Sequence, residues 1–99
     1  MLRITTNEGP ETATMQLEGR VTGPWASEVQ KAWHSLASSL GSRKLRVDLR
    51  GVTHVDANGK QILSDIYSKT RAEFLANTPM TKYFADQATS NGGQNGEER

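Results

Sequence analysis

Polar and apolar residues alternate at the start of the chain, as they do in strands that bury one face. Leu2 and Ile4 alternate with polar neighbours, and the alternation resumes over residues 13–17 after the turn-forming residues 7–10. This pattern predicts a β-hairpin with one buried face.

Two later segments carry apolar residues at helical spacing. The first begins at Pro24, a residue type favoured in the first turn of a helix, and ends near Leu40. The second is predicted over residues 57–70, where Asp56 and Asn58 are both suitable caps for the start of the helix.

Two further strands and a last helix complete the predicted fold. Residues 44–49 alternate again and lead into a short loop at 50–55, and residues 72–76 form a short apolar run. A last helix is expected to begin after Thr78 and Pro79. The order β-β-α-β-α-β-α predicts a single α/β domain with a mixed sheet. Because the strands alternate in polarity, we expect the helices to pack chiefly on one face of that sheet.

The chain is predicted to form one domain over residues 1–88. Its 99 residues suit a single hydrophobic core and leave no room for a second one. Residues 89–99 contain no apolar side chain that could anchor them to a core, so we expect a disordered tail there.

Composition narrows the classes of function. The 12 basic and 11 acidic residues are scattered and nearly balance, so charge indicates neither nucleic acid nor a membrane surface as a partner. The absence of cysteine excludes thiol catalysis, disulfides and cysteine-based zinc sites, and it suits a reducing cytoplasm. No segment has the apolar length of a signal peptide or a membrane span, so a cytoplasmic chain without membrane insertion is expected.

The most informative segment is 47–59, which reads Val-Asp-Leu-Arg-Gly-Val-Thr-His-Val-Asp-Ala-Asn-Gly. It resembles the STAS domains of bacterial anti-sigma-factor antagonists, in which Asp-Leu-Ser-Gly-Val ends a strand and Asp-Ser-Ser-Gly begins a helix. The predicted order of elements is also that of this family. The resemblance implies a STAS-like fold and docking on an anti-sigma factor that is also a kinase. In the family, phosphorylation of the first serine of the motif releases the partner.

The matched positions differ from the family motif at the residue that carries the switch. Asp56 and Gly59 match, but Ala57 stands at the phosphorylated serine and Asn58 at the second serine. Because alanine has no hydroxyl group, the resemblance implies a protein-interaction module that is not switched by phosphorylation at this position. The expected partner-binding residues are Arg50, His54, Asp56, Ala57, Asn58, Gly59, Lys60 and Leu63.

Several of these residue types also have a purely structural explanation. Asp56 and Asn58 are typical helix caps. A glycine at position 59, in the first turn of a helix, indicates a close backbone approach either to the sheet or to a partner. Trp25 is expected in the core or, if partly exposed, as an anchor in an interface.

Catalysis, metal binding and a cofactor are not expected. His54 and Asp56, with Asp48 before them and Ser64 after them, include the residue types of a hydrolytic triad. Ser64, however, falls in the middle of a predicted helix, and no Gly-x-Ser-x-Gly motif is present. The two histidines, His34 and His54, lie on different predicted elements and lack the spacing of metal ligands.

Two other functions remain open for a STAS-like chain. It resembles small accessory subunits that dock on the ATPase of a lipid or organic-solute transporter, and the missing serine fits that role equally well. It could also bind a small ligand, which would require an apolar pocket on the exposed sheet face or beside the second helix.

Overall fold

The computed structural model describes residues 1–94. The elements along the chain are β1 (Leu2–Glu8), β2 (Thr12–Val21), α1 (Pro24–Ser38), β3 (Lys44–Val55), α2 (Ala57–Thr70), β4 (Glu73–Leu75) and α3 (Pro79–Gln94). The predicted order β-β-α-β-α-β-α is confirmed.

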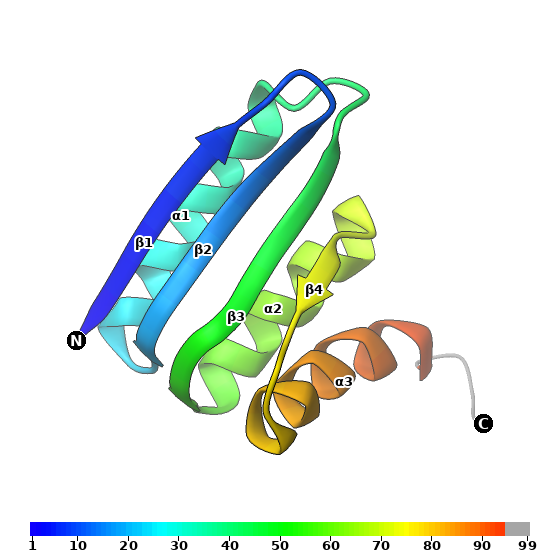
Figure 1. The fold of residues 1–99 in the computed structure, drawn as a ribbon. Coiled ribbons are helices and arrows are strands. Elements are labelled where there is room, and N and C mark those ends of the chain that lie inside the picture. Colours follow the sequence, from blue (N-terminus) through cyan, green and yellow to red (C-terminus); the bar gives the residue numbers. More distant parts are fainter. Residues whose placement is uncertain (95–99) are drawn as a thin grey trace.

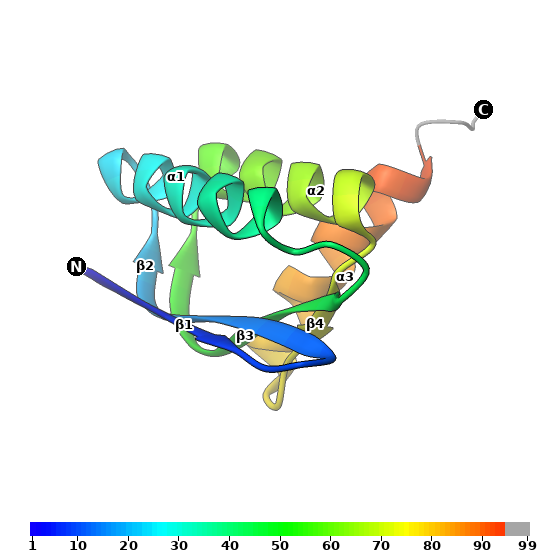
Figure 2. The same cartoon turned by 90° about the horizontal axis from the view of Figure 1, so that it is seen from above.

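The four strands form one mixed sheet in the order β1-β2-β3-β4 (Figure 1). β1 and β2 are antiparallel, whereas β3 is parallel to both β2 and β4. Figure 2 shows α1 and α2 side by side on one face of the sheet, with α3 next to α2 near β4. The other face of the sheet is left open, as the alternating strands predict.

The hydrophobic core lies between the sheet and α1 and α2. β2 and β3 contribute alternate residues to it, since side chains point to opposite faces along a strand. The largest fully buried apolar side chains are Met15, Leu17, Leu45, Leu49, Leu63 and Ile66. Burial of a Leu, Ile or Met side chain contributes roughly 1.5–3 kcal/mol, so this cluster supplies much of the driving force for folding.

The segment 50–55, expected as a loop, is the second half of β3. It remains a strand because it pairs with the end of β2, from Glu18↔Gly51 to Val21↔Val55. The register between the two strands shifts at two irregular points, between Gln16 and Glu18 and again between Gly19 and Arg20.

The last helix is longer than the sequence predicts. α3 continues to Gln94, beyond the predicted domain boundary at residue 88. The disordered tail expected over residues 89–99 stays a prediction, and residues 95–99 lie outside the described part of the chain. Ala88 is buried against the core, and the Thr89 hydroxyl donates a hydrogen bond to the carbonyl oxygen of Ala85 at 3.1 Å. In residues 1–94 no helix combines the length and the apolar character needed to cross a membrane.

Candidate functional site

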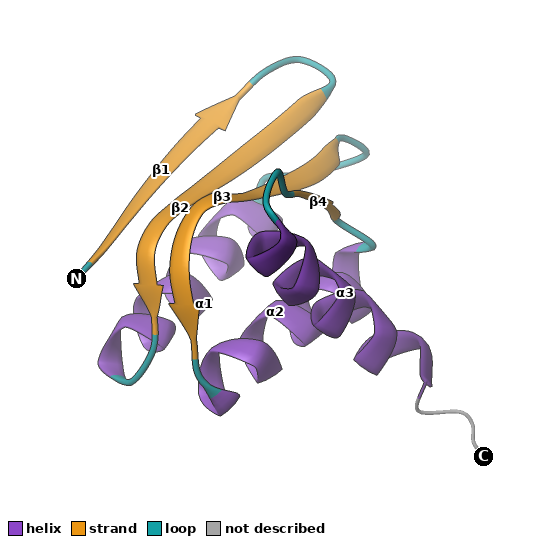
Figure 3. Ribbon diagram, turned by 60° about the horizontal axis from the view of Figure 1, so that its bottom comes forward, coloured by secondary structure: helices purple, strands orange, loops and turns teal. Residues whose placement is uncertain are grey.

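The candidate site lies where β2 and β3 end together. The two strands are parallel, and their last residues, Val21 and Val55, pair with each other. Each strand is followed within a few residues by the first turn of a helix, α1 after β2 and α2 after β3. The two strand-to-helix junctions therefore lie side by side at one end of the domain, as Figure 3 shows.

Asp56 connects the two junctions. One carboxylate oxygen, Oδ1, accepts a hydrogen bond from the backbone N–H of Gly59 at 2.8 Å, which caps α2. The other, Oδ2, accepts from the backbone N–H of Gly23 at 2.9 Å, immediately before α1. The carboxylate therefore orients the starts of both helices, and Asp56 rather than Asn58 is the cap.

These hydrogen bonds stabilise the charged form of the carboxylate and lower the pKa of Asp56, the bond from Gly23 most and that from Gly59 next. A carboxylate with a lowered pKa in the folded state stabilises the fold above its unfolded pKa, near 3.8. This contribution disappears as the pH falls through the lower pKa of the folded state.

We expect Asp56→Asn to lower the urea midpoint of unfolding at pH 7, because the amide keeps the shape of the side chain but loses its charge. The difference from the unchanged chain should begin to shrink as the pH falls below about 4, where Asp56 becomes protonated in the unfolded chain, and should vanish as the pH falls through the lower pKa of the folded state. Urea titrations at a series of pH values between 7 and 2 measure this. A difference that stays constant over the whole range would contradict the assigned role of the carboxylate.

Gly59 is explained by the sheet. A Cβ atom at this position would overlap the carbonyl oxygen of Val21 and lie 3.0 Å from Cγ1 of Val55. The first turn of α2 thus lies directly on the ends of β2 and β3. Of the two explanations for this glycine, close approach to the sheet is the one observed.

The residues of the site that reach the surface come from the ends of β2 and β3 and the starts of α2 and α3. His54, Ala57 and Asn58 are exposed at the end of β3 and the start of α2. The half-buried Lys60 places its Nζ atom 5.7 Å from the ring centroid of Tyr83, near the start of α3. This distance is within the range of a cation–π interaction, which joins the beginnings of α2 and α3.

Three residues at this end of the domain were not foreseen from the sequence. Met80 and Tyr83 are 46% and 51% exposed although both are large and apolar. Arg20 is exposed at the end of β2 and lies opposite His54 on β3. We call the set Arg20, His54, Ala57, Asn58, Lys60, Met80 and Tyr83 the junction surface.

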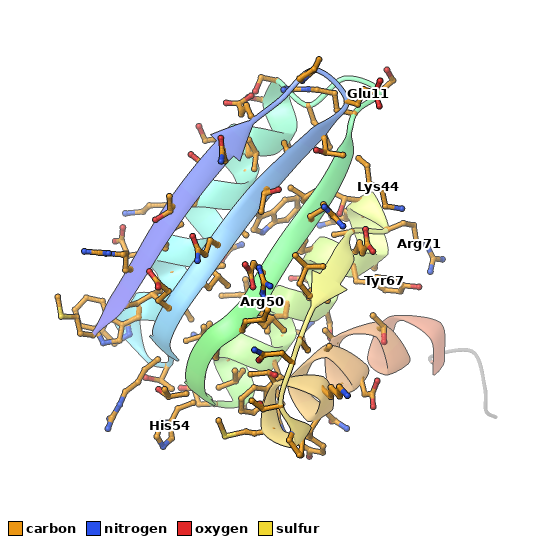
Figure 4. All side chains as sticks on the ribbon, in the orientation of Figure 1. Glu11, Lys44, Arg50, His54, Tyr67 and Arg71 are labelled. Carbon is orange, nitrogen blue, oxygen red and sulfur yellow. The ribbon has the colours of Figure 1, made fainter. Side chains whose placement is uncertain are left out.

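Two residues that were expected to bind the partner lie elsewhere. Leu63 is only 1% exposed, because this side of α2 faces the sheet, and it belongs to the core. Arg50 lies on the open face of β3, apart from His54, as Figure 4 shows. Its Nε and Nη2 atoms donate to the carboxylate of Asp48 at 3.0 and 2.9 Å. These hydrogen bonds lower the pKa of Asp48 despite its burial.

The hydroxyl groups nearest to the motif are already engaged or enclosed. Thr53 donates a hydrogen bond from Oγ1 to the carbonyl oxygen of Gly19 at 3.1 Å. Ser64 is 7% exposed, on the same buried side of α2 as Leu63. Neither hydroxyl lies at the position of the family's phosphorylated serine, where the structure has the exposed side chain of Ala57.

No family model matches the chain, and no curated protein matches it in sequence. Its fold is similar to that of an anti-sigma factor antagonist from Mycobacterium paratuberculosis, with a TM-score of 0.77 and 16% identity over 94% of this chain and 81% of that one. It is also similar to part of a protein called Mglu, with a TM-score of 0.62 and 17% identity over 76% of this chain and 19% of that one. The chain therefore has the STAS-type fold of an anti-sigma factor antagonist, as the motif at residues 47–59 predicts.

Proposed function

We propose that this chain is a non-catalytic regulator of the anti-sigma-factor-antagonist type, which binds a protein partner through the junction surface. In this proposal the partner is an anti-sigma factor or a related kinase in the bacterial cytoplasm. The observation that carries the proposal is the exposure of Tyr83, which contacts Lys60 at the start of α2, and of Met80 in the first turn of α3. The STAS-type fold and the matched motif at residues 47–59 support the choice of partner.

Exposed apolar side chains next to a rigid helix start are typical of protein interfaces. Tyrosine and methionine are enriched in interface cores, and a few such residues commonly carry most of the binding energy. Tyr83 is half-exposed, and the ammonium group of Lys60 lies 5.7 Å from its ring centroid, a contact that favours one orientation of the ring. Little side-chain entropy would be lost when a partner covers this ring.

The charge of the junction surface indicates an acidic partner. Arg20 and Lys60 contribute positive charge, and neither forms an ion pair within residues 1–94. The carboxylate of Asp56 is used internally by the backbone of Gly23 and Gly59. A partner surface with aspartate or glutamate beside an apolar patch would complement this arrangement and associate faster at low salt.

Ala57 makes the proposed interaction independent of phosphorylation at the start of α2. A phosphate at this position would bring about −1.5 to −2 charges to the surface, and alanine has no hydroxyl that could accept it. The chain therefore remains competent for binding whether or not ATP is present. This distinguishes it from the serine-containing members of the family that it resembles.

The decisive experiment is affinity capture of partners from native extract with the tagged chain, with and without ATP. We expect one regulatory partner to be retained equally in both conditions. Lys60→Glu should weaken binding of that partner at least tenfold, because it reverses a charge at the start of α2 and removes the contact to Tyr83. Calorimetry with the purified partner measures the affinity.

Lys69→Glu is the matched control, since it makes the same charge reversal near the far end of α2, on an exposed side chain. It should leave the affinity for the partner unchanged. If Lys60→Glu and Lys69→Glu bind equally well, the junction surface is not the docking site. If the unchanged chain retains only a transporter ATPase, or no protein at all, the proposed regulatory role is wrong.

A further inference from the structure

β1 is an unprotected edge strand. It lies at the outer side of the sheet and pairs only with β2 within residues 1–94 (Figure 1). Its register with β2 is continuous over all seven residues, without a bulge, and it contains no proline and no lysine. Bulges, prolines and lysines commonly keep an edge strand from pairing with a further strand, and β1 has none of them, although it carries the charged residues Arg3 and Glu8.

The free backbone groups of β1 follow from its register. The N–H of Gly9 donates to the Thr12 carbonyl at 2.8 Å, and the N–H of Arg20 donates to the Met1 carbonyl at 3.0 Å. Antiparallel ladders alternate along each strand, so the odd-numbered residues of β1 bond to β2. The N–H and C=O groups of the even-numbered residues point outward, and these are Leu2, Ile4, Thr6 and Glu8.

An apolar groove runs beside this free edge. It has a volume of about 390 Å³ and is lined by Leu2, Ile4, Pro24, Trp25 and Glu28, from β1 and the first turns of α1. Leu2 and Ile4 are only half-buried, whereas Met15 and Leu17 on the neighbouring strand are fully buried. Trp25 is 39% exposed. The helix layer thus leaves the inner side of β1 partly uncovered.

We propose that a second copy of this chain covers the groove, with its β1 antiparallel to β1 of the first copy about a two-fold axis. Such an interface is self-complementary, because each copy supplies a free edge and two apolar side chains on the groove side. The two four-stranded sheets join into one continuous sheet, with the α1 helices of both copies flanking the shared apolar strip.

Charge selects the register of the proposed pairing. Centring the axis on Arg3 would place two guanidinium groups opposite each other. Centring it on Thr5 would place Glu8 of one copy opposite the apolar Leu2 of the other. Glu8 already forms an ion pair with Arg43 of its own copy, at 3.0 Å. Centring it on Ile4 avoids both conflicts. In that register the two Ile4 side chains meet, Arg3 lies opposite Thr5 of the other copy, and Leu2 lies opposite Thr6.

Light scattering coupled to size-exclusion chromatography tests the association over a concentration series. We expect the mass to rise from the 10.9 kDa of one chain toward twice that value as the concentration increases. Thr6→Lys should abolish the rise, because it places a charge on the groove side of the exposed edge. Ser68→Lys is the matched control: it adds the same charge to the exposed surface of α2 and should still dimerise.

Single cysteines test the register, since the chain has no cysteine of its own. Arg3 and Thr5 of the other copy would form a non-hydrogen-bonded pair, with Cα atoms about 4.5 Å apart, within the range of a disulfide. A mixture of Arg3→Cys and Thr5→Cys should therefore form a disulfide-linked heterodimer on mild oxidation. Each variant alone would have Cα atoms about 7–8 Å apart and should link far more slowly.

A chain that remains at the mass of one copy at every concentration overturns the proposal. So does a Thr6→Lys variant that dimerises as well as Ser68→Lys. Faster linking within Arg3→Cys or Thr5→Cys alone than in the mixture overturns the register centred on Ile4. These assays use the purified chain alone, so their outcomes can be told apart from partner capture through the junction surface, which includes no residue of β1 or of the groove.

Discussion

Replacing Leu63 with alanine is expected to lower the free energy of unfolding by about 2–5 kcal/mol. The side chain is 1% exposed and belongs to the cluster between α2 and the sheet. Its truncation removes buried apolar surface and leaves a cavity that the surrounding strands fill only in part. Urea or guanidinium unfolding, followed by circular dichroism, measures the change.

Lys60→Ala is the control for this prediction, because it lies one turn away on the same helix with a half-buried side chain. It should change the unfolding free energy by less than about 1 kcal/mol. The order of the two effects should be reversed for partner binding. Folded Leu63→Ala should still capture the partner, whereas Lys60→Ala should bind it more weakly. A stable Leu63→Ala that no longer captures the partner would show that Leu63 belongs to the interface after all.

Some elements could be predicted from the sequence because local and tertiary signals agree there. α2 has the predicted bounds, residues 57–70. The capping residue Asp56 stands immediately before the segment in which apolar residues recur at helical spacing, so both signals indicate the same start for the helix. The hairpin of β1 and β2 was equally clear from its alternation and turn residues. In both cases one short stretch of chain contains all the information that determines the element.

The second half of β3 could not be predicted because its pattern changes phase. Leu45, Val47 and Leu49 are buried at odd positions, but the next buried residue is Val52, at an even position. The register shift opposite Gln16 and Glu18 accounts for this, since one extra residue in a strand moves the following side chains to the other face. A period-two pattern that breaks in this way resembles a loop in the sequence.

The candidate site was only partly predictable for a related reason. The motif at residues 47–59 identifies the start of α2, but Met80 and Tyr83 come from a helix whose buried side is ambiguous. The apolar residues of α3 fall on two adjacent faces of the helix, one with Met80 and Tyr83 and the other with Phe84 and Ala88. The structure buries the second face, which also contains Thr81. That choice depends on how α3 packs against α2, which no local signal in α3 reveals.

Replacing Gly59 with alanine is expected to lower the free energy of unfolding by about 3 kcal/mol, at the upper end of the usual range for overpacking. Helix propensity alone predicts the opposite sign, a gain of about 1 kcal/mol for alanine over glycine. The new methyl group, however, would overlap the backbone carbonyl of Val21 and crowd the Val55 side chain. A backbone carbonyl within the sheet cannot rotate away, so the start of α2 has to move off the strand ends.

Gly51→Ala is the matched control, because a Cβ atom there would also be crowded, at 2.9 Å, but by the Cγ atom of Glu18. That side chain is flexible and partly exposed and can adopt another rotamer, so the unfolding free energy should change by less than about 1 kcal/mol. Urea titrations of both variants measure the contrast. Because Asp56 and Lys60 flank the displaced turn, Gly59→Ala should also lose partner binding while Gly51→Ala retains it. If both variants are equally stable, α2 does not rest on the ends of β2 and β3 as tightly as the contacts of Gly59 require.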